Sequence, residues 1–187
     1  RMGLGKAIVL IGPRQVGKTT LIRSLLADRP HLHLNGDDST VRALLDEPSK
    51  AKIAAVIRDH SCVFIDEAQR IPEIGLTAKI IVDEFPAIQL ILSGSSAFEL
   101  QNSTQEPLTG RKFEHLLYPI SWEEFELHVG HVEAQGQIQE RLIFGMYPDV
   151  INSRSMAEEV LTQLARSYLF RDILALGNLR KPELLER

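Results

Sequence analysis

Nine residues near the start of the chain carry the clearest chemical pattern of the sequence. They run Gly12-Pro13-Arg14-Gln15-Val16-Gly17-Lys18-Thr19-Thr20 and match G-x-x-x-x-G-K-[ST], the pattern of a phosphate-binding P-loop. Glycine at its fixed positions lets backbone N–H groups point into one concavity, and the start of the following helix favours negative charge there. We expect Lys18 to reach the β and γ phosphates of a nucleotide and Thr19 to bind Mg²⁺. A glycine turn that only joins a strand to a helix is the alternative.

A pair of acids, Asp66 and Glu67, forms the second chemical centre at the end of the apolar run 61–65. Ligands gather at the carboxyl ends of parallel strands, so this pair and the P-loop are expected to converge although they lie far apart in sequence. Asp66 is then placed to hold Mg²⁺, directly or through water. Glu67 is the candidate general base for an attacking water. A buried strand that merely ends in two solvated acids is the simpler interpretation, and the P-loop disfavours it.

Two hydroxyls, Ser93 and Ser95, follow the predicted strand 88–92. At that strand end they could donate hydrogen bonds to a γ phosphate or to the attacking water. Because serine and glycine also dominate ordinary turns, the sequence leaves both interpretations open.

Short apolar runs that alternate with helical patterns predict an α/β fold that positions these residues. Strands are expected over 6–11, 31–34, 61–66, 88–92 and 115–118. Between and after them, helices are expected over 19–27, 39–47, 50–60, 75–85, 138–144 and 156–175, and another after Ser121, which has Glu124 at the capping-box spacing. Residues 130–136 look like a polar connection, and the helices beyond it are predicted to form a small helical lid.

Composition places the 187-residue chain among ordinary globular proteins. Hydrophobic residues make up 44% and charged residues 25%, and no apolar run approaches the ~20 residues of a membrane span. The single cysteine, Cys62, lies inside an apolar run, which predicts a buried, reduced thiol and a cytoplasmic protein with no membrane partner.

The net charge of −4 argues against a nucleic-acid surface spread over the domain, because binding of the phosphate backbone needs clustered Lys and Arg. Only two adjacent basic pairs occur, Arg111-Lys112 and Arg180-Lys181. Each is more typical of a solvated surface than of a DNA contact, so nucleic acid stays an open option rather than a prediction.

Five segments together resemble prokaryotic AAA+-like ATPases, close to the archaeal-type ATPases and to the wider STAND group of signalling NTPases. They are 12–21 with its Gly-Pro-Arg-Gln loop, 64–69 with its Asp-Glu-Ala-Gln acids, 92–96, 108–111 and 118–125. The resemblance implies an ASCE P-loop sheet of strand order 5-1-4-3-2, flanked by helices, with ATP and Mg²⁺ as ligands. It also implies that a C-terminal domain of unknown function follows the ATPase core.

The same resemblance implies roles for single residues. Ser93 or Ser95 matches the sensor 1 position. Arg111 falls where AAA+ proteins carry an arginine finger, which acts on the nucleotide of a neighbouring subunit in an oligomer. The segment 145–148 resembles a GxP-like lid motif, so Pro148 is expected near the adenine. No sensor 2 arginine is assigned.

The predicted organisation is a P-loop ATPase core over 1–129, a helical lid over 130–175 and the start of a linker over 176–187. The abrupt entry into the first strand and the charged tail are typical of a piece of a longer protein, whose C-terminal domain would follow this chain.

The predicted function is Mg²⁺-dependent ATP hydrolysis that drives a conformational change in the attached domain. The alternative is a STAND-like regulatory switch that hydrolyses slowly and whose ATP and ADP forms bind different partners, DNA among them. Phosphotransfer to a small metabolite is a weaker option. GTP is disfavoured because the sequence has no Asn-Lys-x-Asp motif.

Overall fold

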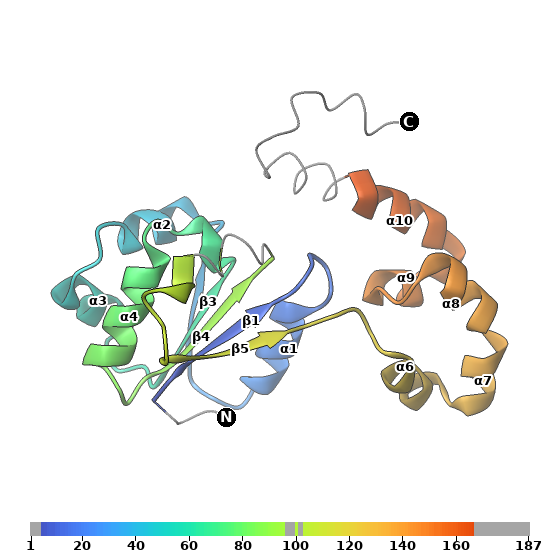
Figure 1. Ribbon diagram of the computed structural model, residues 1–187, viewed down its shortest axis with the longest axis horizontal. Helices are drawn as coiled ribbons and strands as arrows, with labels where there is room; N and C mark the ends of the chain where they lie inside the picture. The colour runs from blue at the N-terminus through green and yellow to red at the C-terminus, as the bar shows by residue number, and fades with distance from the viewer. Residues whose placement is uncertain (1–4, 96–99, 101–102, 167–187) are drawn as a thin grey trace. The chain divides into compact units, whose positions relative to one another are not determined.

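The protein contains a five-stranded parallel sheet in a computed structural model, which describes residues 5–95, 100 and 103–166 (Figure 1). Its strand order is β2-β3-β4-β1-β5, the predicted order seen from the other edge, so the predicted α/β P-loop fold is confirmed. Each neighbouring pair is parallel. The strands are β1 Ala7–Ile11, β2 Leu32–Asn35, β3 Cys62–Asp66, β4 Gln89–Gly94 and β5 Lys112–Leu116.

The three inner strands are apolar because both faces of the sheet are covered. Every residue of β3 is buried, and β1 and β4 are buried at all but one position each. One face packs with helices α2 Ser39–Leu45, α3 Lys50–Ile57 and α4 Ile74–Glu84 around Val9, Ile65 and Leu92. The other face packs Leu10, Phe64 and Ile91 against helix α1 Lys18–Leu25. The carboxyl ends of β1, β3 and β4 therefore lie along one edge of a rigid sheet.

The contacts within the chain define two compact units. Among the described residues, the first holds 5–13 and 17–117, and the second holds 14–16 and 118–166. The second unit is helical, with α6 Trp122–Val129, α7 His131–Gly136, α8 Ile138–Phe144, α9 Pro148–Asn152 and α10 Ala157–Leu164.

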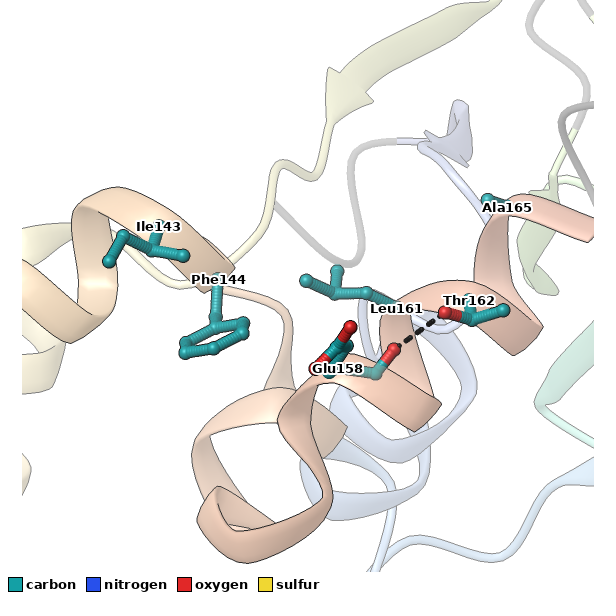
Figure 2. A pocket seen from close by; sticks show the side chains of 6 residues that line it. All are labelled: Ile143, Phe144, Glu158, Leu161, Thr162 and Ala165. Carbon is teal, nitrogen blue, oxygen red and sulfur yellow. Dashed lines mark hydrogen bonds between the residues drawn. The ribbon is translucent and has the colours of Figure 1, made fainter. Parts of the chain in front are cut away.

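Helix α6 begins as the sequence predicts. Ser121 Oγ accepts from the Glu124 amide at 3.1 Å, and the Ser121 amide donates to Glu124 Oε2 at 2.8 Å, which completes a capping box. Elsewhere in this unit α8 and α10 border a pocket of about 500 Å³ (Figure 2). Its one hydroxyl, on Thr162, donates to the Glu158 carbonyl at 2.8 Å and is thus already used within α10.

Two predicted elements are wrong in detail. The last strand was expected at 115–118, but β5 begins at Lys112, because the ladder starts where the Ala7 amide donates to the Arg111 carbonyl at 2.9 Å. The expected polar connection at 130–136 is helix α7, which buries Ala134. Gly130 at φ +89° ends α6 and precedes α7, so the glycine that indicated a loop marks a junction of two helices.

The predicted division into core, lid and linker stays a prediction. The unit boundary after Leu117 assigns α6 to the helical unit. The proposed linker 176–187 and the pair Arg180-Lys181 lie outside the described residues.

Candidate active site

The two fixed glycines of the P-loop are required by its backbone. A Cβ on Gly12, directly after β1, would lie 2.3 Å from the carbonyl oxygen of Leu117, so only glycine fits this approach. Gly17 has φ +95° in the left-handed region that favours glycine, and it immediately precedes α1. The loop therefore turns from β1 into the N-terminus of α1 as the motif predicts.

Lys18, the first residue of α1, is buried with 5% of its surface exposed. Its ammonium donates to the carbonyl oxygens of Gly12 and Pro13, both at 2.8 Å. A buried ammonium needs acceptors around it, and here the loop supplies them. Phosphate oxygens are acceptors of the same kind, so Lys18 lies where it can exchange a backbone partner for a phosphate.

Asp66, at the end of β3, meets α1 at this edge of the sheet. Thr19 Oγ1 donates to Asp66 Oδ2 at 2.7 Å. The other carboxylate oxygen accepts from the Ser93 hydroxyl and, at 3.1 Å, from the Glu67 amide. Asp66 is 6% exposed and Ser93 is fully buried, so the carboxylate is desolvated but well supplied with donors. The predicted convergence of the P-loop helix and the acidic strand is present in the structure.

The oxygen ligands of Thr19 and Asp66 fit Mg²⁺, which prefers hard oxygen donors. Within the described ranges no group of three or more His, Cys, Asp and Glu side chains could hold a metal. Mg²⁺ does not need such a cage, because it is usually held by one or two protein ligands together with substrate phosphates and water.

Glu67 differs from Asp66 in its backbone conformation and in its hydrogen-bond partners. Its backbone adopts φ +47°, which is strained for a residue with a Cβ, and begins the single helical turn η1 Ala68–Arg70. Its Oε2 accepts from Gln69 Nε2 at 2.7 Å and from Ser95 Oγ at 3.0 Å. Strand β4 and the residue that follows it thus supply one hydroxyl to each acid, Ser93 to Asp66 and Ser95 to Glu67.

Gln69 is the site residue that the sequence interpretation left without a role. Its Nε2 also donates to Ser95 Oγ at 3.1 Å, so one amide contacts both Glu67 and Ser95. Its place in Asp-Glu-Ala-Gln, two residues after the predicted base, was the available signal, but a glutamine at that spacing has no chemistry that indicates a role by itself.

The structure does not bring every predicted site residue to this edge. Arg111 lies at the amino-terminal ends of β1 and β5, the opposite edge of the sheet, and donates to Asp83 Oδ1 at 2.6 Å. Its action on a neighbouring subunit stays a prediction. Residues 14–16 group with the helical unit, where Pro148 is the first residue of α9, and the Thr20 side chain is exposed.

Two titratable groups lie in the strands beneath the site. His33 of β2 stacks on Phe64 of β3 with 4.8 Å between ring centroids. Burial lowers the pKa of His33, and the nearby charge of Arg23 lowers it further. Burial also raises the pKa of the free Cys62 thiol, which confirms the expected buried cysteine.

Comparison with known proteins gives the family of this chain. A family model described as an AAA domain matches residues 4–126, well over half of the chain. The chain therefore belongs to the AAA domain family, and its first unit is a P-loop domain of the nucleotide-binding ATPase type. The resemblance to AAA+-like ATPases is thereby confirmed.

The alignments with known relatives cover only part of this chain and a still smaller share of each relative. Uncharacterized proteins of Mycobacterium bovis and Mycobacterium tuberculosis are each 35% identical over 106 residues, 56% of this chain and 23% of the relative. An uncharacterized protein of Haemophilus influenzae is 31% identical over 90 residues, 46% of this chain and 21% of its own length. The matched region thus spans less than a quarter of these curated relatives.

A solved structure, the Walker-type ATPase PABY2304 of Pyrococcus abyssi, matches with a TM-score of 0.49 and 19% identity over 95% of this chain and 81% of that chain.

Across the residues that the structure describes, no helix is both long and apolar enough to cross a membrane.

Proposed function

We propose that this chain binds ATP with Mg²⁺ and hydrolyses it to ADP and phosphate. The observation that carries the proposal is the hydrogen bond from Thr19 of α1 to Asp66 of β3, with Lys18 directly before Thr19 and Glu67 directly after Asp66. A cation, two oxygen ligands for a metal and a carboxylate base at the N-terminus of a helix are the groups that phosphoryl transfer to water needs.

Each group has a distinct part in this proposal. The loop amides and Lys18 bind the β and γ phosphates, and Thr19 and Asp66 hold Mg²⁺. When bound, Mg²⁺ supplies charge neutralisation at the phosphates. Asp66 is fixed for its part by Ser93 and the Glu67 amide, which occupy Oδ1 and leave Oδ2 toward Thr19.

Glu67 is the proposed base. A water oxygen forms a bond to the γ phosphorus, and the bond from that phosphorus to the bridging oxygen breaks, with its electron pair leaving on ADP. The water proton passes to the Glu67 carboxylate. Glu67 suits this part because its side chain is directed to Ser95 and Gln69 rather than to the ligands of the proposed metal.

The test is Glu67→Gln, which keeps the shape of the side chain and removes its basicity. We expect ATP affinity within about threefold of the parent and a turnover number lower by about 10² to 10⁴, the usual contribution of a general base. The measurements are nucleotide titration and steady-state phosphate release. Glu159→Gln, the same change at an exposed residue of α10, is the control and should leave both unchanged. Parent-like turnover of the Glu67 variant would reject the assignment.

Arg111 is proposed to act on the nucleotide of a second copy of the chain. In one chain it is held against Asp83, with 43% of its side chain exposed. If it acts in trans, turnover per chain rises with protein concentration, and Arg111→Ala removes that rise; a concentration dependence that survives the substitution excludes the role.

The proposal has three further parts. Hydrolysis is coupled to a further domain, and the helical unit acts as a lid with Pro148 near the adenine. The protein is cytoplasmic, which a reduced Cys62 supports. The slow regulatory switch stays the alternative, and single-turnover kinetics distinguish it.

A further inference from the structure

Glu67, Gln69 and Ser95 form a closed ring of hydrogen bonds. The distances are 2.7 Å from Gln69 Nε2 to Glu67 Oε2, 3.1 Å from Gln69 Nε2 to Ser95 Oγ, and 3.0 Å from Ser95 Oγ to Glu67 Oε2. The amide of Gln69 has two N–H groups, and the ring uses both of them. The hydroxyl of Ser95 accepts one bond and donates the other, so its single proton is also committed.

The ring treats the two carboxylate oxygens of Glu67 unequally. Oε2 accepts two hydrogen bonds, whereas Oε1 has no partner among the residues that the structure describes. A proton added at Oε2 would compete with both donors, while a proton added at Oε1 leaves the ring intact. The two oxygens therefore have different roles: Oε2 holds the side chain in place, and Oε1 is the oxygen that can react.

The backbone around the ring is arranged to admit Gln69. A Cβ on Gly94 would lie 2.6 Å from Gln69 Oε1, so the space beside β4 exists only because that residue is glycine. On the other side a Cβ on Gly36 would lie 2.3 Å from the Glu67 carbonyl oxygen. Gly36, after β2, and Gly94, at the end of β4, thus lie on either side of the strained turn at Glu67. That turn brings the Gln69 amide to the Glu67 carboxylate.

We propose that Gln69 is a positioning residue which, with Ser95, holds Glu67 by Oε2 and leaves Oε1 to take the proton of the attacking water. The proposal rests on ATP hydrolysis with Glu67 as base. It goes beyond that assignment because it names the reacting oxygen and gives a part to Gln69, whose hydrogen bonds among the described residues go to Glu67 and Ser95.

The central variant is Gln69→Met, which keeps length and volume and removes both donors. With Oε2 released, Glu67 samples other rotamers, and misplacement of a base by about 1 Å can cost about 10²-fold. We expect the turnover number to fall by about 10- to 100-fold, while ATP affinity stays within about twofold because the P-loop is untouched. Gln69→Asn, a shorter amide, should recover only a minor part of the loss because it cannot span both partners.

Gln89→Met is the matched control. Gln89 is a half-buried glutamine at the opposite end of β4, and its Nε2 donates to two backbone carbonyls, those of Lys6 and Leu90, both at 3.0 Å. The same substitution there removes an amide donor from another half-buried glutamine of the same unit, away from the hydrogen-bonded ring. It should lower the Tm by a similar amount without reducing turnover.

A double variant decides whether Gln69 acts through Glu67. In the Glu67→Gln background there is no base to position, so Gln69→Met should not lower the residual turnover further. An equal fold loss in both backgrounds overturns the proposal, as does parent-like turnover of Gln69→Met alone. A parent chain that binds ATP without hydrolysing it rejects the proposed function itself, and this result is distinct because it is seen before any variant is made.

Discussion

The two units of this chain organise polarity in opposite ways. In the sheet unit the polar site residues are buried and small neutral donors surround the acids, as with Ser93, Ser95 and Thr19. In the helical unit large apolar side chains face outward, among them Leu127, Val132 and Leu142, which are 87%, 85% and 81% exposed. In the first unit the apolar side chains of the inner strands are buried, and its most exposed large apolar residues among those described, Leu25 and Leu116, are 58% and 55% exposed. The second unit has apolar surface that the described residues do not cover. The folding of this unit alone therefore does not explain why apolar residues stand at those positions.

In the helical unit one buried arginine lies among apolar side chains and belongs to a charged network that extends to the surface. Arg141 is 4% exposed, lies over the Phe125 ring at 5.8 Å and pairs with Glu140. Arg154 joins Glu140 to Glu133, at 2.7 Å and 3.2 Å. The hydrogen bond from Arg154 lowers the pKa of Glu140, and the charges of both arginines add to the effect. Of this network only Arg141 is buried, so the cost of desolvating a charge falls on that residue.

The largest expected contrast between the units is in core packing. Ile53→Ala in α3 removes a fully buried side chain and should lower the free energy of unfolding by about 2 to 5 kcal/mol. Leu142→Ala in α8 should change it by less than about 0.5 kcal/mol, because that side chain is already in water. Urea unfolding measures both. A loss above about 2 kcal/mol for the Leu142 variant would break the comparison, since it would mean that this side chain is covered in solution.

A smaller contrast is expected between two Gly→Ala changes. Gly12→Ala places a Cβ 2.3 Å from a backbone oxygen that cannot swing aside, and should cost about 1 to 3 kcal/mol of stability. Gly136→Ala, at the end of α7 with no atom within 4 Å of its Cβ, should stabilise by up to about 1 kcal/mol. Thermal unfolding of both variants provides the comparison. Equal Tm values for Gly12→Ala and the parent would show that the loop relaxes away from Leu117.

The smallest effects concern pH. The pKa of His33 is lowered below the usual 6.5, so the folded state binds fewer protons and stability falls as pH drops below about 6.5. The pKa of Glu140 is also lowered, so its contribution is present above about pH 4.5 and is lost as pH falls further. His33→Phe, which keeps the stacked ring, should remove the first slope, and Glu140→Gln the second. Urea titrations from about pH 7.5 to 3.5 check this; unchanged slopes contradict the assigned causes.

The sheet unit was predictable because its signals are local and agree. The apolar runs before Gly12 and Asp66 have no polar alternation, which fits inner parallel strands. The gathering of ligands at the carboxyl ends of parallel strands then predicted that the P-loop and Asp66 would converge, and Thr19 donates to Asp66 at 2.7 Å. The edge strand β5 was displaced in the prediction because its intermediate and exposed residues lack that continuous apolar signal.

The rest depended on contacts that sequence spacing does not reveal. Nothing in the local pattern says that Gln69 reaches Ser95, because that contact requires the turn at Glu67 and the missing Cβ of Gly94. The position of Arg111 at the amino-terminal edge depended on the true start of β5. Helix α7 was missed because glycines stand at both of its ends.

The contact between Gly12 and Leu117 has a mechanical consequence. Leu117 is the last residue of the sheet unit, and its amide donates to the Ile11 carbonyl at 2.7 Å, so the chain leaves this unit beside the first residue of the P-loop. Backbone meets backbone there, and no side chain stands between to absorb a displacement. A shift of the backbone at Gly12 is thus passed directly to the backbone at Leu117, where the chain leaves the sheet unit.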